Sequence, residues 1–335
     1  MSKSRRSFLR SGGAMTAGAL AAPFVGPVST ARAAWLDKPV RIVVPNTPGG
    51  PSDMLARVLA PLLQDALGGT FIVENKGGGG GNIGIGSVAR AEPDGHTLLL
   101  ATSVIAVNPA LYGDKLPYDP LVDFTYVAEL ATTPNIFTID SRLGIGSMQE
   151  FIAAAKKDPT KFNIAVPPVT TTAMIGVELL KMVDGLKVGV VVHTGGGQAL
   201  QSVLSGAVQV SAGALAPALP HIEAGTLKAL AIMGDTRWPE LPNCPTMTEL
   251  GYKDYVLDTF LAVFAPANTP RDVIGKLNEA IKTSFARPDI RSTLVKNAFN
   301  PEVKGPEGLK ARMQREVPLF KDIVARTGIK LNENG

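Results

Sequence analysis

Short apolar runs alternate along the chain with longer segments whose apolar residues recur at helical spacing. A short apolar run between turn residues indicates a buried strand, whereas apolar residues three and four positions apart indicate a helix facing a core. The pattern predicts strands at 42–44, 70–73, 97–101, 124–129, 135–139, 162–166, 187–192, 208–212, 227–233 and 260–264. It predicts helices capped by Ser52 or Asp53 and at 82–91, 148–157, 172–183, 198–204, 217–224, 271–285, 288–297 and 306–326. This alternation favours an α/β fold with parallel sheets and helices on both faces. The run at 187–192 is almost wholly apolar, which is typical of a strand buried on both faces.

Two such sheets fit the length of the chain better than one. We expect the chain to leave a first lobe near residues 136–141 and to return to it near 258–264. Residues 34–137 and 259–335 would then form lobe 1, with the final helices packed on it, and residues 138–258 would form lobe 2. Two crossings between lobes create a hinge and a cleft, an arrangement that suits ligand capture by closure.

The first 33 residues have the pattern of a signal peptide for twin-arginine export. Arg5 and Arg6 precede a mildly apolar segment at 14–28, and Ala31 and Ala33 form an A-x-A cleavage site. The alternative, a membrane anchor, is disfavoured because the apolar segment is shorter than the roughly 20 residues that a span needs. The sequence therefore predicts a periplasmic protein.

Charge and single residues exclude several function classes. Removing the leader takes away five cations and no acids, so the formal net charge falls from +4 to −1 and nucleic-acid binding is not expected. The three histidines lack the spacing of metal ligands, and the single Cys244 has no base near it in sequence. We expect no metal, no cofactor and no catalytic activity.

A glycine-rich turn follows the first predicted strand. Residues Thr47, Pro48, Gly49 and Gly50 lead into the helix start at 52–53. Such a turn points free backbone N–H groups and the positive end of the helix dipole at one spot, which suits a carboxylate. The alternative is a tight turn without a ligand.

A second glycine run has to be weighed as a dinucleotide site. Gly79, Gly81 and Gly84 have the G-x-G-x-x-G spacing after a predicted strand. However, the next strand ends at Thr102, not at the acidic residue that would bind the ribose. A loop near the rim of the cleft is the favoured interpretation.

An ordered set of motifs resembles one family across the whole mature chain. The motifs lie at 39–53, 73–84, 91–99, 195–200, 204–206, 225–231 and 243–246. They resemble the Bug-type solute receptors of tripartite tricarboxylate transporters. The resemblance implies a two-lobed, type II-like periplasmic-binding-protein fold with two doubly wound sheets. It also implies a monomer that delivers a carboxylate to a membrane permease without catalysis.

The resemblance also implies a ligand site on both lobes. On lobe 1 the carboxylate would be held by the Thr47–Gly50 turn, by Ser52 and Asp53, and by the hydroxyls of Thr102 and Ser103. On lobe 2 the matching positions are Val169, Thr170, Thr171, Thr172, Thr194, Gly195, Gly196 and Gly213. Two helix ends facing each other across a cleft suit a ligand with a carboxylate at each end.

Lobe 2 departs from the pattern of the family. Thr194 stands where a Lys or Arg is common, and Gly213 stands where an Asp is common. Loss of the acid disfavours an α-amino ligand, while Val169 and neighbouring prolines favour an apolar body. We therefore expect an aromatic dicarboxylate such as terephthalate, or a longer-chain one. A periplasmic α/β enzyme and a ligand sensor for a signalling partner stay open as alternatives.

Overall fold

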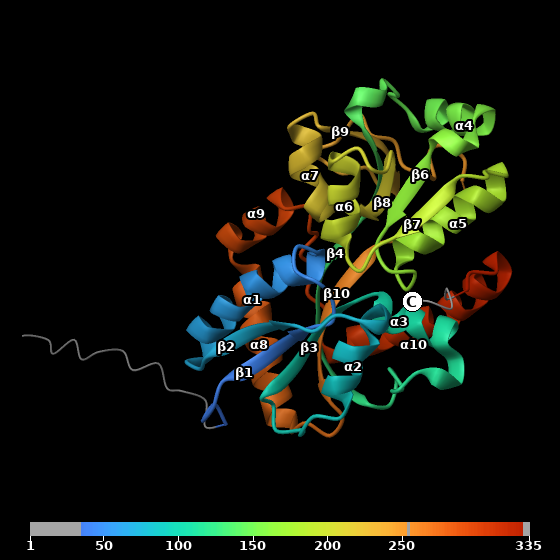
Figure 1. The fold of residues 1–335 in the computed structure, drawn as a ribbon. Coiled ribbons are helices and arrows are strands. Elements are labelled where there is room, and N and C mark those ends of the chain that lie inside the picture. The colour runs from blue at the N-terminus through green and yellow to red at the C-terminus, as the bar shows by residue number, and fades with distance from the viewer. Residues whose placement is uncertain (1–34, 253–254, 331–335) are drawn as a thin grey trace, which may run out of the picture. The chain divides into compact units, whose positions relative to one another are not determined.

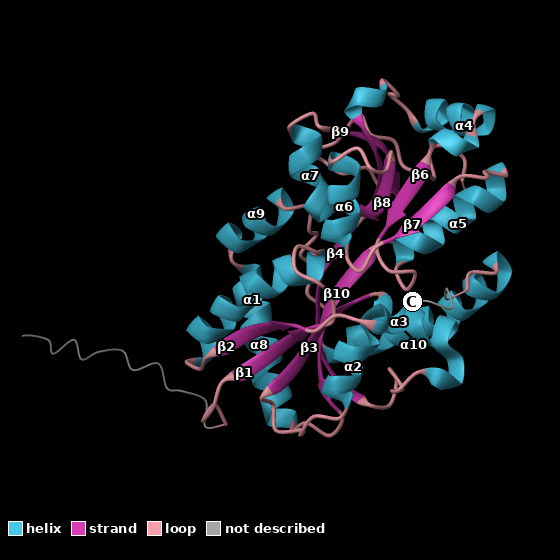
Figure 2. Cartoon of the chain, viewed as in Figure 1, coloured by secondary structure: helices cyan, strands magenta, loops and turns pink. Residues whose placement is uncertain are grey.

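The computed structural model describes residues 35–252 and 255–330, which form two five-stranded sheets flanked by helices (Figures 1 and 2). The predicted signal peptide lies outside the described residues. Both sheets belong to one compact unit of the chain. The strands are β1 (Val40–Val44), β2 (Phe71–Asn75), β3 (Thr97–Thr102), β4 (Phe124–Thr133), β5 (Asn135–Asp140), β6 (Asn163–Val166), β7 (Gly189–Val192), β8 (Val210–Ala214), β9 (Leu227–Met233) and β10 (Thr259–Pro266). The helices are α1 (Pro51–Leu67), α2 (Asn82–Ala89), α3 (Val104–Tyr112), α4 (Met148–Lys157), α5 (Thr172–Asp184), α6 (Gly196–Leu204), α7 (Leu215–Glu223), α8 (Arg271–Ala286), α9 (Pro288–Lys296) and α10 (Pro306–Thr327).

The two sheets share one strand order. The first runs β2-β1-β3-β10-β4 and the second runs β7-β6-β8-β5-β9. In each, the fourth strand is antiparallel to its neighbours: β10 to β3 and β4, and β5 to β8 and β9. The expectation of parallel sheets is therefore wrong for these two strands, and both sheets are mixed. The expectation of an α/β fold with two sheets is confirmed.

The reversed strands are those that carry the chain between the sheets. Only Pro134 separates β4 from β5, and no helix lies between Tyr255 and β10. Each of them enters its sheet directly from the other sheet and pairs antiparallel with both of its neighbours.

The two crossings lie side by side. The amide Nδ2 of Asn135, at the start of β5, donates a hydrogen bond of 2.6 Å to the carbonyl of Leu257. The hydroxyl of Thr259, at the start of β10, donates to Oδ1 of Asn135 over 3.2 Å. The outgoing and returning chains are thus tied together where the sheets meet.

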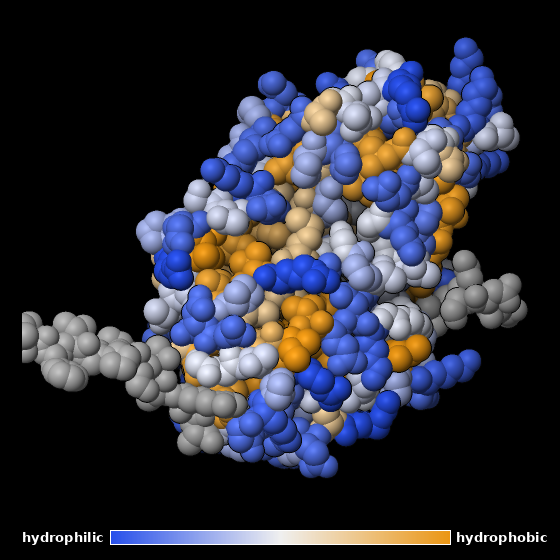
Figure 3. All heavy atoms as spheres, turned by 60° about the vertical axis from the view of Figure 1, so that its left-hand side comes forward, coloured by the Kyte–Doolittle hydropathy of each residue, from blue (hydrophilic) through white to orange (hydrophobic). Residues whose placement is uncertain are grey.

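The C-terminal helices cover the first sheet. Helix α8 packs on α1 and β4, and α10 packs on α3 and β4, with further contacts to α5. On the face shown in Figure 3, hydrophilic residues cover most of the surface, interrupted by separate hydrophobic patches. No helix in the described ranges 35–252 and 255–330 is long and apolar enough to cross a bilayer.

One strand and one helix differ from the sequence prediction in an instructive way. Strand β7 lies at the edge of the second sheet, and Val191 and Val192 are 37% and 38% exposed. The prediction of a strand buried on both faces is therefore wrong. Helix α3 was not predicted, because it is apolar on nearly every side and contains Pro109, so it shows no helical period.

Candidate functional site

A cavity of about 50 Å³, measured as the space open to the centres of water-sized molecules, lies where the two sheets meet. Its walls come from both sheets and from both crossings. None of the described side chains that line it carries a charge. The lining residues are Asn46, Gly50, Pro51, Ser52, Thr102, Ser103, Val104, Asn135, Ile136, Pro167, Pro168, Thr171, Thr172, Ala173, Gly196, Ala199, Leu200, Ser211, Ala212, Gly213, Ala214, Pro217, Ala218 and Thr259.

Five helices present their N-terminal turns to this cavity. Helices α1, α3, α5, α6 and α7 each contribute first-turn residues to the lining. The first turn of a helix has N–H groups without intrahelical partners, and its dipole places about half a positive charge there. The cavity is therefore a candidate site for an anion, which the backbone of these first turns would bind.

The start of α1 differs from the expected arrangement. Gly50 is the N-cap, Pro51 is the first helical residue, and no side chain caps the helix. The interpretation of Ser52 or Asp53 as the cap is therefore wrong. Pro51 has no N–H to be capped, and its fixed φ is suited to a first helical position.

Ser52 and Asp53 instead brace the preceding turn. The hydroxyl of Ser52 donates to Oδ1 of Asn46 over 3.1 Å. Oδ2 of Asp53 accepts from the backbone N–H of Gly49 over 3.0 Å and from Nε of Arg57 over 3.1 Å. Burial alone would raise the pKa of Asp53, but Arg57 and the Gly49 N–H outweigh it and hold that pKa below its ordinary value. Asp53 does not line the cavity.

The predicted site residues fall into two groups. Those that line the cavity are Gly50, Ser52, Thr102, Ser103, Thr171, Thr172, Gly196 and Gly213. Those that do not line it are Thr47, Pro48, Gly49, Asp53, Val169, Thr170, Thr194 and Gly195. Val169 packs against the core, and the Thr194 hydroxyl donates to the side chain of Gln198.

Sequence reasoning missed four polar residues in the lining. Asn46 lies directly before the predicted turn, while Asn135 and Thr259 begin the two crossing strands, and Ser211 lies on β8. A polar residue at each expected crossing was the available signal for Asn135 and Thr259.

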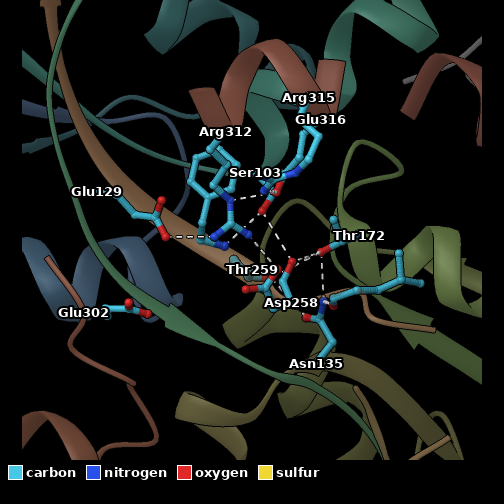
Figure 4. A network of polar contacts seen from close by, with 12 residues as sticks. Ser103, Glu129, Asn135, Thr172, Asp258, Thr259, Glu302, Arg312, Arg315 and Glu316 are labelled. Carbon is cyan, nitrogen blue, oxygen red and sulfur yellow. Dashed lines mark hydrogen bonds and ion pairs between the residues drawn. The ribbon is translucent and has the colours of Figure 1, made fainter. Parts of the chain in front are cut away.

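The hydroxyls and the amide at the back of the cavity are held by hydrogen bonds (Figure 4). Asn135 Nδ2 also donates to the hydroxyl of Thr172 over 2.8 Å, and that hydroxyl donates to the carbonyl of Asp258 over 3.2 Å. The backbone N–H of Phe260 donates to Ser103 Oγ over 3.0 Å. These hydrogen bonds fix the orientation of Asn135, Thr172 and Ser103 in the closed arrangement.

On two sides of the cavity, a loop of the first sheet contacts a loop of the second. Thr170 Oγ1, before α5, donates to the carbonyl of Gly80 over 3.2 Å. On the other rim, a Cβ added to Gly197 would lie 3.5 Å from the carbonyl oxygens of Pro48 and Gly49. Loops from opposite sheets are thus in contact on both sides, so the structure is in a closed arrangement.

In the described part of the chain we looked for a metal site and for a reactive cysteine. This part contains no group of three or more His, Cys, Asp or Glu side chains that could hold a metal ion. Cys244 is buried outside the cavity lining, and burial raises the pKa of its thiol to about 11.

Comparison with known proteins places the chain in a family. Residues 55–329 match the family model described as the tripartite tricarboxylate transporter family receptor. The chain is 32% identical to protein BugT of Bordetella pertussis over 88% of this chain and 90% of that protein. A protein of R. palustris solved with adipate superposes with a TM-score of 0.84 at 29% identity, covering 88% of this chain and 99% of that one.

A second solved structure extends the comparison. MatC from Rhodopseudomonas palustris with bound malate gives a TM-score of 0.79 at 28% identity, covering 85% of this chain and 98% of that one. With the family model matched over most of its length, this chain belongs to the tripartite tricarboxylate transporter receptor family and is a Bug-type member of it.

Proposed function

We propose that this protein is a periplasmic receptor that captures a carboxylate between its two lobes and delivers it to the permease of a tripartite tricarboxylate transporter. The observation that carries the proposal is the uncharged cavity at which five helix N-termini converge. Two relatives of known structure, one solved with adipate and the other with malate, support it.

Neutral donors are sufficient for a carboxylate in this cavity. A hydrogen bond from an N–H or O–H group to an ionised acceptor is about twice as strong as a neutral one. Ser52, Ser103 and Thr172 also line the cavity, but their hydroxyl protons are already donated, to Oδ1 of Asn46 or to the carbonyl of Asp258. The carboxylate is therefore held mainly by N–H groups in the first turns of the helices. A lysine or arginine is not needed, and its absence from the described lining avoids a buried cation when the cavity is empty.

The cavity wall on the side of the second sheet favours a ligand whose carboxylates are joined by an apolar group. The second sheet contributes mainly Pro, Ala and Leu side chains, namely Pro167, Pro168, Ala199, Leu200, Ala212, Pro217 and Ala218. No acid among the described lining residues could pair with an ammonium group, which disfavours amino acids. The ligand is therefore an aromatic dicarboxylate such as terephthalate, or a longer-chain dicarboxylate.

Capture proceeds by closure of the lobes about the two crossings. Residues 34–137 and 259–335 act as lobe 1, and residues 138–258 act as lobe 2. A ligand that touches both lobes binds the closed form more tightly than the open one, so it shifts the population toward closure. The permease reads the closed form. The receptor is a monomer, is exported by the twin-arginine route and performs no chemistry on its ligand.

Titration calorimetry tests the proposal with four ligands: terephthalate, adipate, citrate and aspartate. We expect terephthalate or adipate to bind most tightly and to be recovered unchanged. Thr172→Val should weaken that binding, whereas Thr283→Ala, at an exposed site on α8, should not. Tight binding of aspartate alone would reject the ligand class. Formation of a product would favour the alternative of a periplasmic enzyme.

A further inference from the structure

A buried arginine lies behind the cavity, on the far side of the returning chain. Arg312 of α10 is only 7% exposed. Its Nη1 lies 2.8 Å from Oε1 of Glu129 on β4, and its Nη2 lies 2.7 Å from Oδ1 of Asp258. Its Nε forms an ion pair of 2.7 Å with Glu316, one turn further along α10 (Figure 4). The guanidinium also covers the ring of Phe260 at 4.7 Å from its centroid.

The carboxylates around Arg312 keep its side chain charged and hold it in place. Burial lowers the pKa of Arg312, but Asp258, Glu316 and Glu129 together raise it above its ordinary value. Burial raises the pKa of Glu316, one of its partners. An arginine can engage several carboxylates at once because its donors form a rigid, planar fork. Arg312 therefore ties α10, β4 and the returning chain at Asp258 to one point.

Asp258 connects this anchor to the cavity. Its carboxylate contacts Arg312, while its main-chain carbonyl accepts the hydrogen bond from Thr172 at the start of α5. The preceding carbonyl, of Leu257, accepts the hydrogen bond from Asn135. Thr172 and Asn135 both line the cavity. A continuous set of contacts therefore runs from α10, packed on the first sheet, to the N-terminus of α5, which packs on the second.

We propose that Arg312 is a positioning residue for ligand capture: by holding Asp258 it fixes the returning chain so that Thr172 and Asn135 keep the geometry of the closed cavity. The inference rests on the proposed receptor function for its binding readout. It predicts that loss of the contact between Arg312 and Asp258 favours the open form. The affinity then falls by the same factor for each carboxylate, because no group that touches the ligand has changed.

Asp258→Asn is the sharpest variant, because it keeps the shape and the main-chain carbonyl and removes the charge. Arg312→Met is a second variant, although it leaves Glu129 buried without its closest cation. Arg315→Met is the matched control. Arg315 is on the same helix and also contacts Glu316, at 3.4 Å, but its side chain is 66% exposed and makes no contact with Asp258 among the described interactions.

The first readout is calorimetry with terephthalate and adipate, together with urea unfolding of the ligand-free protein. We expect Asp258→Asn to raise both Kd values about tenfold, the size of one charge-assisted hydrogen bond, with their ratio unchanged. Arg315→Met should stay within about twofold. A merely structural role would lower the free energy of unfolding and leave the Kd of the folded protein unchanged. A wild-type Kd in Asp258→Asn would overturn the proposal.

The second readout needs no ligand. Spin labels at two exposed positions, Lys282→Cys on α8 and Lys187→Cys before β7, report the distance between the lobes. We expect Asp258→Asn to shift the distance distribution toward the open form, and Arg315→Met to leave it as in the parent. If the labelled protein without further substitution binds no carboxylate, the proposed receptor function fails, but the distance between the labels still tests the role of Arg312. An unshifted distance distribution in Asp258→Asn would overturn that role.

Discussion

Thr47 and Gly195, from loops of opposite sheets, are in direct contact outside the cavity lining. A Cβ built on Gly195, the N-cap of α6, would overlap with Oγ1 of Thr47 in the loop after β1, and it would lie 3.3 Å from Cβ of Thr47. The side chain of Thr47 therefore occupies the space that a side chain at position 195 would need, while the backbone N of Thr47 lies 4.0 Å from the same Cβ. Glycine at position 195 is a requirement of the closed arrangement and not of the local backbone, because Gly195 has an extended φ of −170°.

Gly195→Ala is expected to hold the lobes apart. Overpacking of this kind costs about 1–3 kcal/mol, so the Kd for the best carboxylate should rise roughly fivefold to a hundredfold. Calorimetry measures the Kd, and small-angle scattering measures the compaction with saturating ligand. The double variant Gly195→Ala, Thr47→Ala is the control, since it removes the overlapping hydroxyl and should recover part of the affinity. A wild-type Kd in Gly195→Ala would show that the two loops do not need to meet.

The opposite rim gives a second test of closure, at Gly80. A Cβ on Gly80 would lie 2.6 Å from Cγ2 of Thr170 and 2.7 Å from the hydroxyl of Tyr112. Gly79 has a similar left-handed φ, of 57° against 62°, but its nearest neighbour is 3.8 Å away. Both alanine variants carry the same backbone strain of about 1 kcal/mol. We expect Gly80→Ala to weaken ligand binding more than Gly79→Ala does, in a titration of both. Equal effects would assign the loss to the backbone alone.

The hydrogen bonds that the Asp53 carboxylate accepts from Gly49 and Arg57 should make the stability of the first lobe depend on pH. The folded-state pKa of Asp53 is lowered, so its stabilisation is present above its ordinary pKa of 3.8 and is lost as the pH falls through the folded value. Asp53→Asn should cost about 1–3 kcal/mol of unfolding free energy near pH 7, and the difference should shrink as the pH falls below 3.8. Urea unfolding near pH 7 and at acid pH measures the difference.

Asp272→Asn is the matched control for that experiment. Asp272 also lies in the first turn of a helix, with Lys276 four residues on at 3.7 Å, but both side chains are exposed. Such surface pairs contribute about 0–1 kcal/mol. A pH-independent effect of Asp53→Asn would contradict the role of its charge.

Cys244 is expected to be unreactive in the folded protein. It is buried, and burial raises the pKa of its thiol to about 11, so the thiolate that reacts with disulfide reagents is scarce near pH 8. A thiol-exchange assay should show slow labelling in buffer and rapid labelling in urea. Native labelling at the rate of a free cysteine would place Cys244 at an accessible surface instead.

The sequence predicts most elements well because their signals are local. The helix at 148–157 and the strand at 227–233 have the predicted bounds. Strand direction is different, because it depends on how the chain travels between sheets, and no residue within β5 or β10 encodes it. The exposure of Val191 and Val192 on β7 likewise follows from the position of the strand in the sheet.

The candidate site was predictable where glycine marks it and not where distant segments build it. Gly50 and Gly196 precede or begin helices that point at the cavity, and turns of this kind are visible in sequence. Asn135 and Thr259 are separated by more than a hundred residues and meet only through the hydrogen bond between the two crossings. That bond exists only in the folded chain.

The five helix N-termini at the cavity have a consequence for how substitutions would alter ligand selectivity. Because their N–H groups belong to the main chain, a single side-chain replacement would leave the proposed anion-binding groups in place. Under the proposed function, substitutions at Ala199, Leu200 or Pro217 would therefore reshape the wall and redirect the receptor to another acid. Such a site would be a starting point for engineering biosensors with altered selectivity.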